Sequence, residues 1–221
     1  MPEPLQSQKR LKTIKDAYSH TVALANIAVA QAKAGDVKGA LATSKTIANT
    51  SYRTLTFARI ASAQLEAGDV KGAKENIAQA LVTARTIEDA SSRASTLANV
   101  VVTQAEAGNV REALATANTI EDAYSRASTL ANIAVAQAKA GDANEAKETI
   151  AQVVATTQTI ANTSYLTLTL ARIAWAQAEA GDLKEAKKTF AKALATSKTI
   201  KGVYERNSVL ASIAKVLAIM K

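Results

Sequence analysis

The sequence predicts an all-α fold in which antiparallel helix pairs stack into one solenoid. Five glycines, each followed by aspartate or asparagine, recur with alternating separations of 33 and 40 residues, which indicates an internal repeat. They are Gly35, Gly68, Gly108, Gly141 and Gly181. Apolar residues before them recur at the steps of three and four that define a helix face. Both prolines precede residue 5, so the rest of the chain lacks the strongest helix breaker. We therefore expect residues 1–221 to form a single α-helical repeat domain.

Each repeat unit is expected to be a helix, a tight turn and a second helix. Leu130 and Ile133 precede Gly141 at the spacing of one helix face. Gly141 ends the first helix, because glycine adopts the left-handed conformation at little cost. Asp142 is the expected N-cap of the second helix, where its carboxylate would accept a bond from a backbone N–H, and Glu145 would complete a capping box.

A Thr-Ile dipeptide at the end of each second helix sets the helix lengths. Its isoleucine lies 21 residues before the next turn glycine, whereas the distance from glycine to isoleucine is 12 or 19 residues. The difference of seven residues is one heptad, so the longer second helices keep the same face inward. First helices are expected at residues 18–34, 52–67, 91–107, 124–140, 164–180 and 203–220. Second helices are expected at residues 36–48, 69–88, 109–121, 142–161 and 182–200, and residues 5–16 are expected to be the tail of another.

The core is expected to consist of alanine and aliphatic side chains. Hydrophobic residues form 48% of the chain but aromatic residues only 4%, so few large rings are available for burial. One helix pair cannot cover its own apolar faces, so neighbouring pairs must stack to bury them. The position eight residues before each turn glycine carries an isoleucine or valine, namely Ile27, Ile60, Val100, Ile133 and Ile173, and Ile213 is the corresponding residue of the last expected helix. We expect all six to be buried.

The repeat resembles the tetratricopeptide repeat (TPR), a helix pair of about 34 residues with small and large apolar residues at set positions. In the unit of Gly141 the residues that carry the resemblance are Leu130, Ile133, Ala134, Ala146 and Ile150. The resemblance covers nearly the whole chain, although the tryptophan, tyrosine and terminal proline of the family pattern are missing. It implies a right-handed superhelix whose first helices line a concave groove. It also implies a protein-interaction scaffold that holds an extended peptide or a helix in that groove.

The chain is basic, with a net charge of +8 and a pI near 9.6. This surplus favours anionic partners, but the charges are interspersed, and no regular base-reading pair recurs in the repeats, which disfavours nucleic acid. The chain has no cysteine, its first residues form no apolar leader, and no run approaches the roughly 20 apolar residues that cross a membrane. We expect a cytoplasmic protein that does not contact a membrane.

The sequence offers few residues for a catalytic site. The single histidine, His20, occupies a position that is arginine in most other repeats, so a surface role is favoured over general-base catalysis. There is no metal-ligand spacing or phosphate-binding glycine loop, and capping explains the glycine-aspartate turns better than calcium binding does. We therefore expect a protein that is not an enzyme and that holds no cofactor and no metal.

Partner binding is favoured at positions that vary between repeats, because stacking constrains the packed ones. Positions 16, 13, 9, 6 and 2 residues before the turn glycine form one stripe on the first helices. The candidate partner-binding residues on this stripe are Asn26, Tyr52, Arg59, Asn99, Asn132, Tyr165, Arg172 and Trp175. Arginine and asparagine beside aromatic rings can bind a peptide backbone or carboxylates. Alternatively, the arginines pair with nearby glutamates such as Glu66 and Glu179, and Trp175 fills a gap between helices.

A row of glutamines lies four residues before each turn glycine and consists of Gln31, Gln64, Gln104, Gln137 and Gln177. The last repeat has Leu217 at this position instead. Because the row recurs at all five turns, we expect a structural role, with side-chain amide bonds between adjacent helices.

The favoured function is a scaffold for protein–protein interaction that binds a peptide or helical segment of acidic character in the groove. Two alternatives come from other classes. A basic solenoid could bind nucleic acid, and stacked repeats could self-assemble end to end. The expected assembly is accordingly a monomer or a weak homo-oligomer formed by end stacking.

Overall fold

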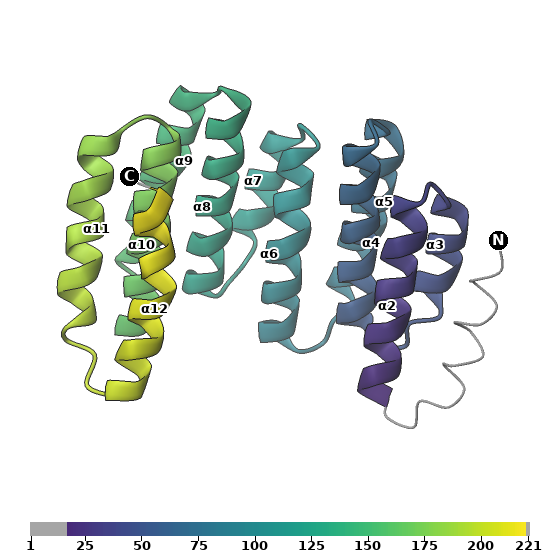
Figure 1. The fold of residues 1–221 in the computed structure, drawn as a ribbon, viewed down its shortest axis with the longest axis horizontal. Coiled ribbons are helices and arrows are strands. Elements are labelled where there is room, and N and C mark those ends of the chain that lie inside the picture. The colour runs from purple at the N-terminus through teal and green to yellow at the C-terminus, as the bar shows by residue number, and fades with distance from the viewer. Residues whose placement is uncertain (1–16, 220–221) are drawn as a thin grey trace. The chain divides into compact units, whose positions relative to one another are not determined.

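A computed structural model describes residues 17–219 as α-helices joined by short turns (Figure 1). The helices are α2 (Ala17–Lys33), α3 (Val37–Lys45), α4 (Thr50–Glu66), α5 (Val70–Arg85), α6 (Ala90–Glu106), α7 (Val110–Asn118), α8 (Ala123–Ala140), α9 (Ala143–Thr157), α10 (Thr163–Glu179), α11 (Leu183–Ser197) and α12 (Val203–Ile219). The all-α class is confirmed. The expected helix tail at residues 5–16 lies outside the described residues.

The helices alternate between two kinds, as the repeat predicts. We call α2, α4, α6, α8, α10 and α12 the A helices, and α3, α5, α7, α9 and α11 the B helices. A helices pack on the B helix that follows them, as α4 does on α5 and α10 on α11, so the predicted sequential antiparallel pairs are confirmed. The B helices end before the Thr-Ile dipeptide rather than at it. Its isoleucine is nevertheless buried, as at Ile47 and Ile120, because it turns back onto the core just beyond the helix end.

The turn between the helices of a pair is closed by the backbone. Gly141 has φ +94°, and the other four turn glycines also have positive φ values, between +80° and +86°. The N–H of Gly141 donates to the carbonyl of Ala138 at 3.1 Å, and the N–H of Asp142 donates to the carbonyl of Gln137 at 2.9 Å. These two bonds form a Schellman motif, which satisfies the last carbonyls of the A helix. The glycine is required here because side chains strain the left-handed conformation.

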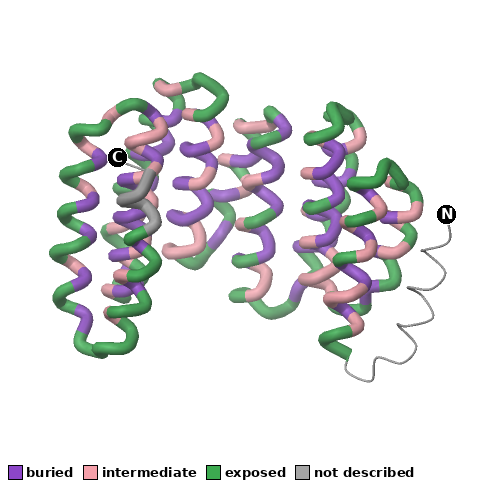
Figure 2. The backbone as a smooth tube through the Cα atoms, in the orientation of Figure 1, coloured by how far each residue is buried: buried purple, intermediate pink, exposed green. Residues whose placement is uncertain are grey.

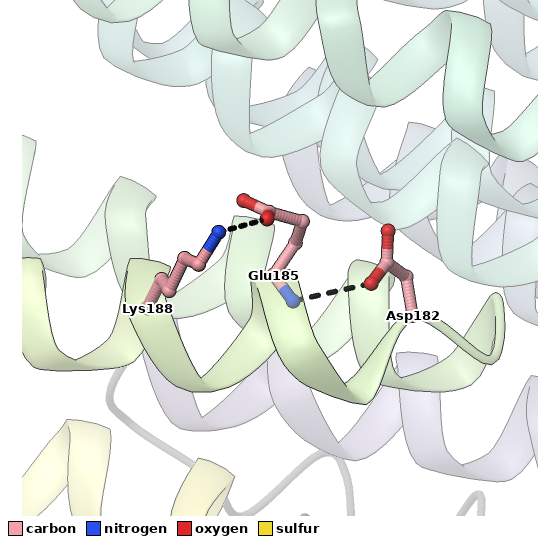
Figure 3. A network of polar contacts seen from close by, with 3 residues as sticks. All are labelled: Asp182, Glu185 and Lys188. Atoms are coloured by element: carbon pink, nitrogen blue, oxygen red, sulfur yellow. Dashed lines mark hydrogen bonds and ion pairs between the residues drawn. The ribbon is translucent and has the colours of Figure 1, made fainter.

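Side-chain capping of the B helices is only partly as predicted. The carboxylates of Asp36, Asp69 and Asp182 accept the backbone N–H three residues on, the last from Glu185 at 3.1 Å (Figure 3). Asp142 occupies the N-cap position without such a bond, so the prediction was wrong there. The capping box with Glu145 fails for a clear reason, since the Asp142 N–H already donates to the carbonyl of Gln137.

The chain divides into two compact units, residues 1–103 and 104–221. In the first unit, α4 packs on both α2 and α3. In the second unit, α8 packs on α7, α10 packs on α8 and α9, and α12 packs on α10 and α11. Each A helix named here therefore contacts the A helix before it, the B helix before it, or both. The expectation of a single domain stays a prediction.

Buried positions recur along the A helices (Figure 2), and most of them carry alanine, isoleucine, leucine or valine. Ile60, Val100 and Ile133 are fully buried, and the equivalent Ile173 and Ile213 are 1% exposed. Ile27 is only half-buried, since within the described residues no helix precedes α2. Small residues pack around this row: in the first unit Ala28, Ala32, Ala40 and Ala63 form one cluster with Ile60. The core follows the predicted use of alanine and aliphatic residues.

An arginine row connects the end of a B helix to the next A helix. The guanidinium of Arg126 donates to the carbonyl of Ile120 at 2.6 Å and to that of Glu121 at 3.1 Å. Arg53, Arg93 and Arg206 make the same bond to the isoleucine six residues before them. A cation bonded to carbonyls at a helix C-terminus also favours the helix dipole. These arginines are therefore structural.

The glutamine row bonds within the helix pairs. The side-chain carbonyl of Gln64 accepts from the amide of Asn76 at 2.6 Å, joining α4 to α5. Gln31 and Gln137 accept from threonine hydroxyls twelve residues on, at 2.8 Å in both pairs. The structural role expected for this row is therefore present in three of the pairs.

Candidate functional site

The candidate residues lie on the A helices α2, α4, α6, α8 and α10. Residues spaced by seven or ten positions share one helix face, so Tyr165, Arg172 and Trp175 align along α10. Tyr52 and Arg59 align in the same way along α4. The candidates fall into both compact units, with Asn26, Tyr52, Arg59 and Asn99 in the first and the other four in the second.

In the first unit the polar candidates are open to solvent. Asn26, Arg59 and Asn99 are exposed, whereas Tyr52 is half-buried against Leu24, Ala25 and Ile47. The amide of Asn99 donates to the carbonyl of Ser95 at 2.8 Å, so part of its hydrogen-bonding capacity is used within α6. Asn26 on α2 and Arg59 on α4 belong to helices that pack directly on each other.

A tyrosine pair joins α2 to α4. The rings of Tyr18 and Tyr52 meet edge to face, with centroids 5.9 Å apart and planes 86° from parallel. A hydrogen bond with Tyr18, followed by desolvation, raises the pKa of the Tyr52 phenol, and the charge of Arg59 opposes this rise. Two phenol groups and a guanidinium therefore converge at this surface. The sequence pattern did not identify Tyr18, which lies one position outside the predicted stripe.

The second unit carries the corresponding pair between α8 and α10. The rings of Tyr124 and Tyr165 stack with centroids 4.4 Å apart and planes 15° from parallel. Tyr165 is 47% exposed and Tyr124 is half-buried, so part of the stacked pair faces solvent. Asn132 and Arg172 are half-buried on the same two helices. Tyr124 was also missed, although its position relative to the turn glycine is the same as that of Tyr18.

Trp175 is held by charged neighbours. Its indole N–H donates to the Glu179 carboxylate at 2.9 Å, one helical turn away. The ammonium of Lys139, on α8, lies 5.7 Å from the ring centroid, within cation–π range. The same lysine opposes the rise that burial causes in the pKa of Glu106. Trp175 therefore stays half-exposed at the surface with a fixed orientation.

The arginines of the stripe have no carboxylate partner among the described residues. In that part of the chain the structure contains one ion pair, between Lys188 and Glu185 on α11 (Figure 3). Arg59 and Arg172 take no part in it, so their predicted alternative pairing with nearby glutamates is absent there. Each guanidinium can donate to a carboxylate of another molecule in a bidentate manner.

The described residues contain no cluster of three or more histidine, cysteine, aspartate or glutamate side chains that could hold a metal ion. Between residues 17 and 219, no helix combines the length and the apolar character that crossing a bilayer requires.

A comparison with known protein families matches one of the helix pairs and its glycine turn. The family model described as tetratricopeptide repeat matches residues 170–196, which run from α10 through the Gly181 turn into α11. The chain is a TPR-like helical repeat protein. A TPR-like fold typically mediates protein–protein interaction.

The solved structures that match this chain include two that are 19% identical to it. Both are crystal structures described as Podosopora anserina putative kinesin light chain nearly identical TPR-like repeats, and one of them carries a substitution. Each has a TM-score of 0.46. They cover 85% and 86% of this chain, and 99% and 100% of their own. No curated protein matches the sequence.

Proposed function

We propose that this TPR-like protein is a non-catalytic scaffold that binds an extended peptide or a helical segment of acidic character on the stripe of its A helices. The observation that carries the proposal is the state of Arg59 and Arg172, which have no carboxylate partner among the described residues and lie on the same helices as two paired tyrosines. The partner is another protein or peptide, and the expected cytoplasmic location stays a prediction.

The residues of the stripe supply complementary interactions. The guanidinium of Arg172 can bind a carboxylate through two parallel hydrogen bonds, and the amide of Asn132 can bind a peptide backbone. Tyr165 and Trp175 offer apolar ring surface with few rotatable bonds, as hot-spot residues commonly do. Together they favour a segment that alternates acidic side chains with apolar or aromatic ones.

The way in which these side chains are held also favours binding. Tyr52 packs against buried residues, and Trp175 is fixed by Glu179 and Lys139, so little side-chain freedom is lost on association. The A helices themselves are fixed by their buried faces. Side chains that are already ordered lose less conformational entropy when a partner binds.

Selection from a random peptide library tests the proposal while the partner is still unidentified. A phage library of random 12-residue peptides would be panned on the wild type, on the Arg59→Ala/Arg172→Ala variant, and on a matched control, Arg85→Ala/Arg111→Ala. The control removes the same charge from exposed arginines of B helices. We expect acidic peptides with apolar residues from the wild type and the control but not from the stripe variant. Enrichment of the same peptides by the stripe variant, or no enrichment by the wild type, would contradict the proposal.

Nucleic-acid binding is the second candidate, and it would use a different surface. The exposed lysines of α11 are Lys184, Lys187, Lys188 and Lys192, which give this B helix a basic outer face. Binding by this face predicts a mobility shift that weakens steeply with salt. The triple variant Lys184→Glu/Lys188→Glu/Lys192→Glu would abolish that shift, while the peptides selected on the stripe would still bind. If no mobility shift were seen at low salt, nucleic-acid binding would be excluded.

End-to-end self-assembly remains the alternative for the oligomeric state. A monomer and a weak homo-oligomer differ in how their apparent mass depends on concentration. Static light scattering over a hundredfold concentration range would distinguish them, since a monomer keeps a mass of 23.0 kDa throughout.

A further inference from the structure

The first two A helices of the chain are close duplicates of the fourth and fifth. Residues 49–69 and 162–182 are identical at 17 of 21 positions, and residues 17–36 and 123–142 at 16 of 20. The helices α2 and α4 lie in the first compact unit, and α8 and α10 lie in the second. The same surface residues are therefore presented once in each unit.

The duplicated helices pair the same two tyrosine positions, although the rings meet edge to face in the first unit and stack in the second. Tyr18 meets Tyr52 between α2 and α4, and Tyr124 meets Tyr165 between α8 and α10. The contact is not a general feature of neighbouring A helices. Between α10 and α12 the corresponding positions hold Ser164 and Glu205, whose side chains form a hydrogen bond. Tyrosine pairs between neighbouring A helices are therefore found at two places in the described part of the chain, once in each compact unit.

Each tyrosine pair is accompanied by an arginine two helical turns along the second helix of the pair. Arg59 follows Tyr52 by seven residues and Arg172 follows Tyr165 by seven, and neither arginine forms an ion pair with a described residue. We call Tyr18, Tyr52 and Arg59 the first cluster, and Tyr124, Tyr165 and Arg172 the second cluster. Paired rings and a guanidinium about 10 Å further along the same helix suit a segment that carries an apolar side chain and, further along, a carboxylate.

The two clusters differ at one surface position that bears on affinity. Ser62, on the A helix of the first cluster, is replaced by Trp175 in the second. Lys33 and Lys139 occupy equivalent positions, but only Lys139 has an indole ring to lie against, at 5.7 Å. Tryptophan contributes more contact area than any other side chain at binding surfaces, so the second cluster should bind more tightly.

We infer that the protein has two separate binding sites of the same chemistry, one in each compact unit, and that each takes one copy of the same acidic, apolar-containing peptide segment. The second site binds that segment about tenfold more tightly than the first, the ratio that roughly 1.4 kcal/mol produces. This inference rests on the proposed function, since it specifies the number and the ranking of the sites on the stripe.

Selection on the single variants separates the two sites. The random 12-residue phage library would be panned in parallel on Arg59→Ala, which retains the second cluster, and on Arg172→Ala, which retains the first. We expect one shared consensus from both, and none from the double variant. A synthetic peptide of that consensus should titrate the wild type in two steps by calorimetry. A consensus from only one single variant, or one-step binding of a single peptide, would overturn the inference while leaving the proposed function standing. A wild type that enriches no peptide would refute both.

A reciprocal exchange tests the ranking of the sites. On the Arg172→Ala background, Ser62→Trp should strengthen binding of the consensus peptide about tenfold. On the Arg59→Ala background, Trp175→Ser should weaken it about tenfold. Circular dichroism at 222 nm would verify that each variant keeps its helix content. Affinities that do not respond to the exchange in folded variants would refute the role assigned to Trp175.

Discussion

The ring of Tyr124 on α8 lies flat against the ring of Tyr165 on α10, with centroids 4.4 Å apart. The contact joins a residue 17 positions before one turn glycine to a residue 16 positions before the next. It fixes how neighbouring A helices meet at their N-terminal ends, and it leaves one ring 47% exposed. The equivalent residues of the first unit, Tyr18 and Tyr52, also pair across neighbouring A helices, but their rings meet edge to face with centroids 5.9 Å apart. In both units the paired tyrosines contribute to helix packing and to the candidate binding surface.

The buried isoleucine row should dominate stability. Ile133→Ala should lower the free energy of unfolding by about 2–5 kcal/mol, because Ile133 is fully buried and its loss leaves a cavity between stacked helices. Urea denaturation followed by circular dichroism would measure the change. Val154→Ala is a suitable control, since Val154 is 45% exposed on α9 of the same unit, and it should cost less than about 0.5 kcal/mol. Equal losses in the two variants would show that burial of the A-helix face does not govern stability.

The turn glycines should be intolerant of substitution for conformational reasons. Gly141→Ala should cost about 1–2 kcal/mol, because its φ of +94° is unfavourable for a side chain, although an added Cβ would meet no atom within 4 Å. Gly202→Ala provides the comparison, since its added Cβ would make only ordinary contacts of 3.5 Å with Glu205. That variant should lose about 0.5–1 kcal/mol, because Gly202 lies at the N-cap of α12, where glycine is favoured over alanine. If Gly202→Ala were the more damaging substitution in urea unfolding, the role given to the left-handed turn would be wrong.

The arginine row should stabilise the ends of the B helices. Arg126→Ala should cost about 1–2 kcal/mol, because it removes charged hydrogen bonds to the carbonyls of Ile120 and Glu121. Arg111→Ala removes an exposed arginine from the same unit and should change stability by less than about 0.5 kcal/mol. Thermal unfolding of the two variants at equal concentration would compare them. A loss no greater for Arg126 than for Arg111 would contradict the structural assignment.

The cap of α5 should make stability depend on pH. Hydrogen bonds from the Gly72 N–H and then from the Gln64 amide hold the pKa of Asp69 below its ordinary value. The folded state therefore favours the ionised carboxylate. This contribution is present above the unfolded pKa of about 3.9 and is lost as pH falls through the lower folded pKa. Asp69→Asn keeps a capping oxygen but cannot be protonated there. Its urea midpoint should fall less than that of the wild type between pH 6 and pH 3, and parallel curves would disprove the linkage.

The repeat, the turns and the core could be predicted because each depends on local sequence. The spacing of Gly141 from the Thr-Ile dipeptide defines the helix pair, and helical periodicity alone identifies Ile133 as buried. The left-handed turn needs only a glycine. The turn glycine, the Thr-Ile dipeptide and the buried isoleucine or valine recur in successive helix pairs, so each pair supports the assignment of the next.

The candidate site could be predicted only in part, because its contacts depend on how helices meet. Tyr18 and Tyr124 were missed, since the rotation of one A helix against the next is not encoded in the period of either helix. The pairing of Arg172 with Glu179 was also offered as an alternative and is absent. The two lie seven residues apart, about 10 Å along the helix axis, whereas Trp175 lies one turn from Glu179 and donates to it.

The capping of the B helices shows a similar limit. Asp142 and Asp182 occupy equivalent positions after a turn glycine, yet only the Asp182 carboxylate accepts a bond from the following helix. The identity of the residue determines whether a cap is available, while the side-chain torsion determines whether it forms. The backbone bonds of the Schellman motif are present in both turns, so the turn does not depend on the cap.

Mapping of a bound peptide by NMR tests most directly whether the A-helix stripe is the binding surface. The consensus peptide from the phage selection would be titrated into ¹⁵N-labelled protein, and shift changes of the backbone amides would be followed. We predict that the largest changes fall on the A helices α2, α4, α8 and α10, around Tyr52, Arg59, Tyr165 and Arg172. Changes concentrated on the B helices, with the A-helix stripe unaffected, would contradict the assignment.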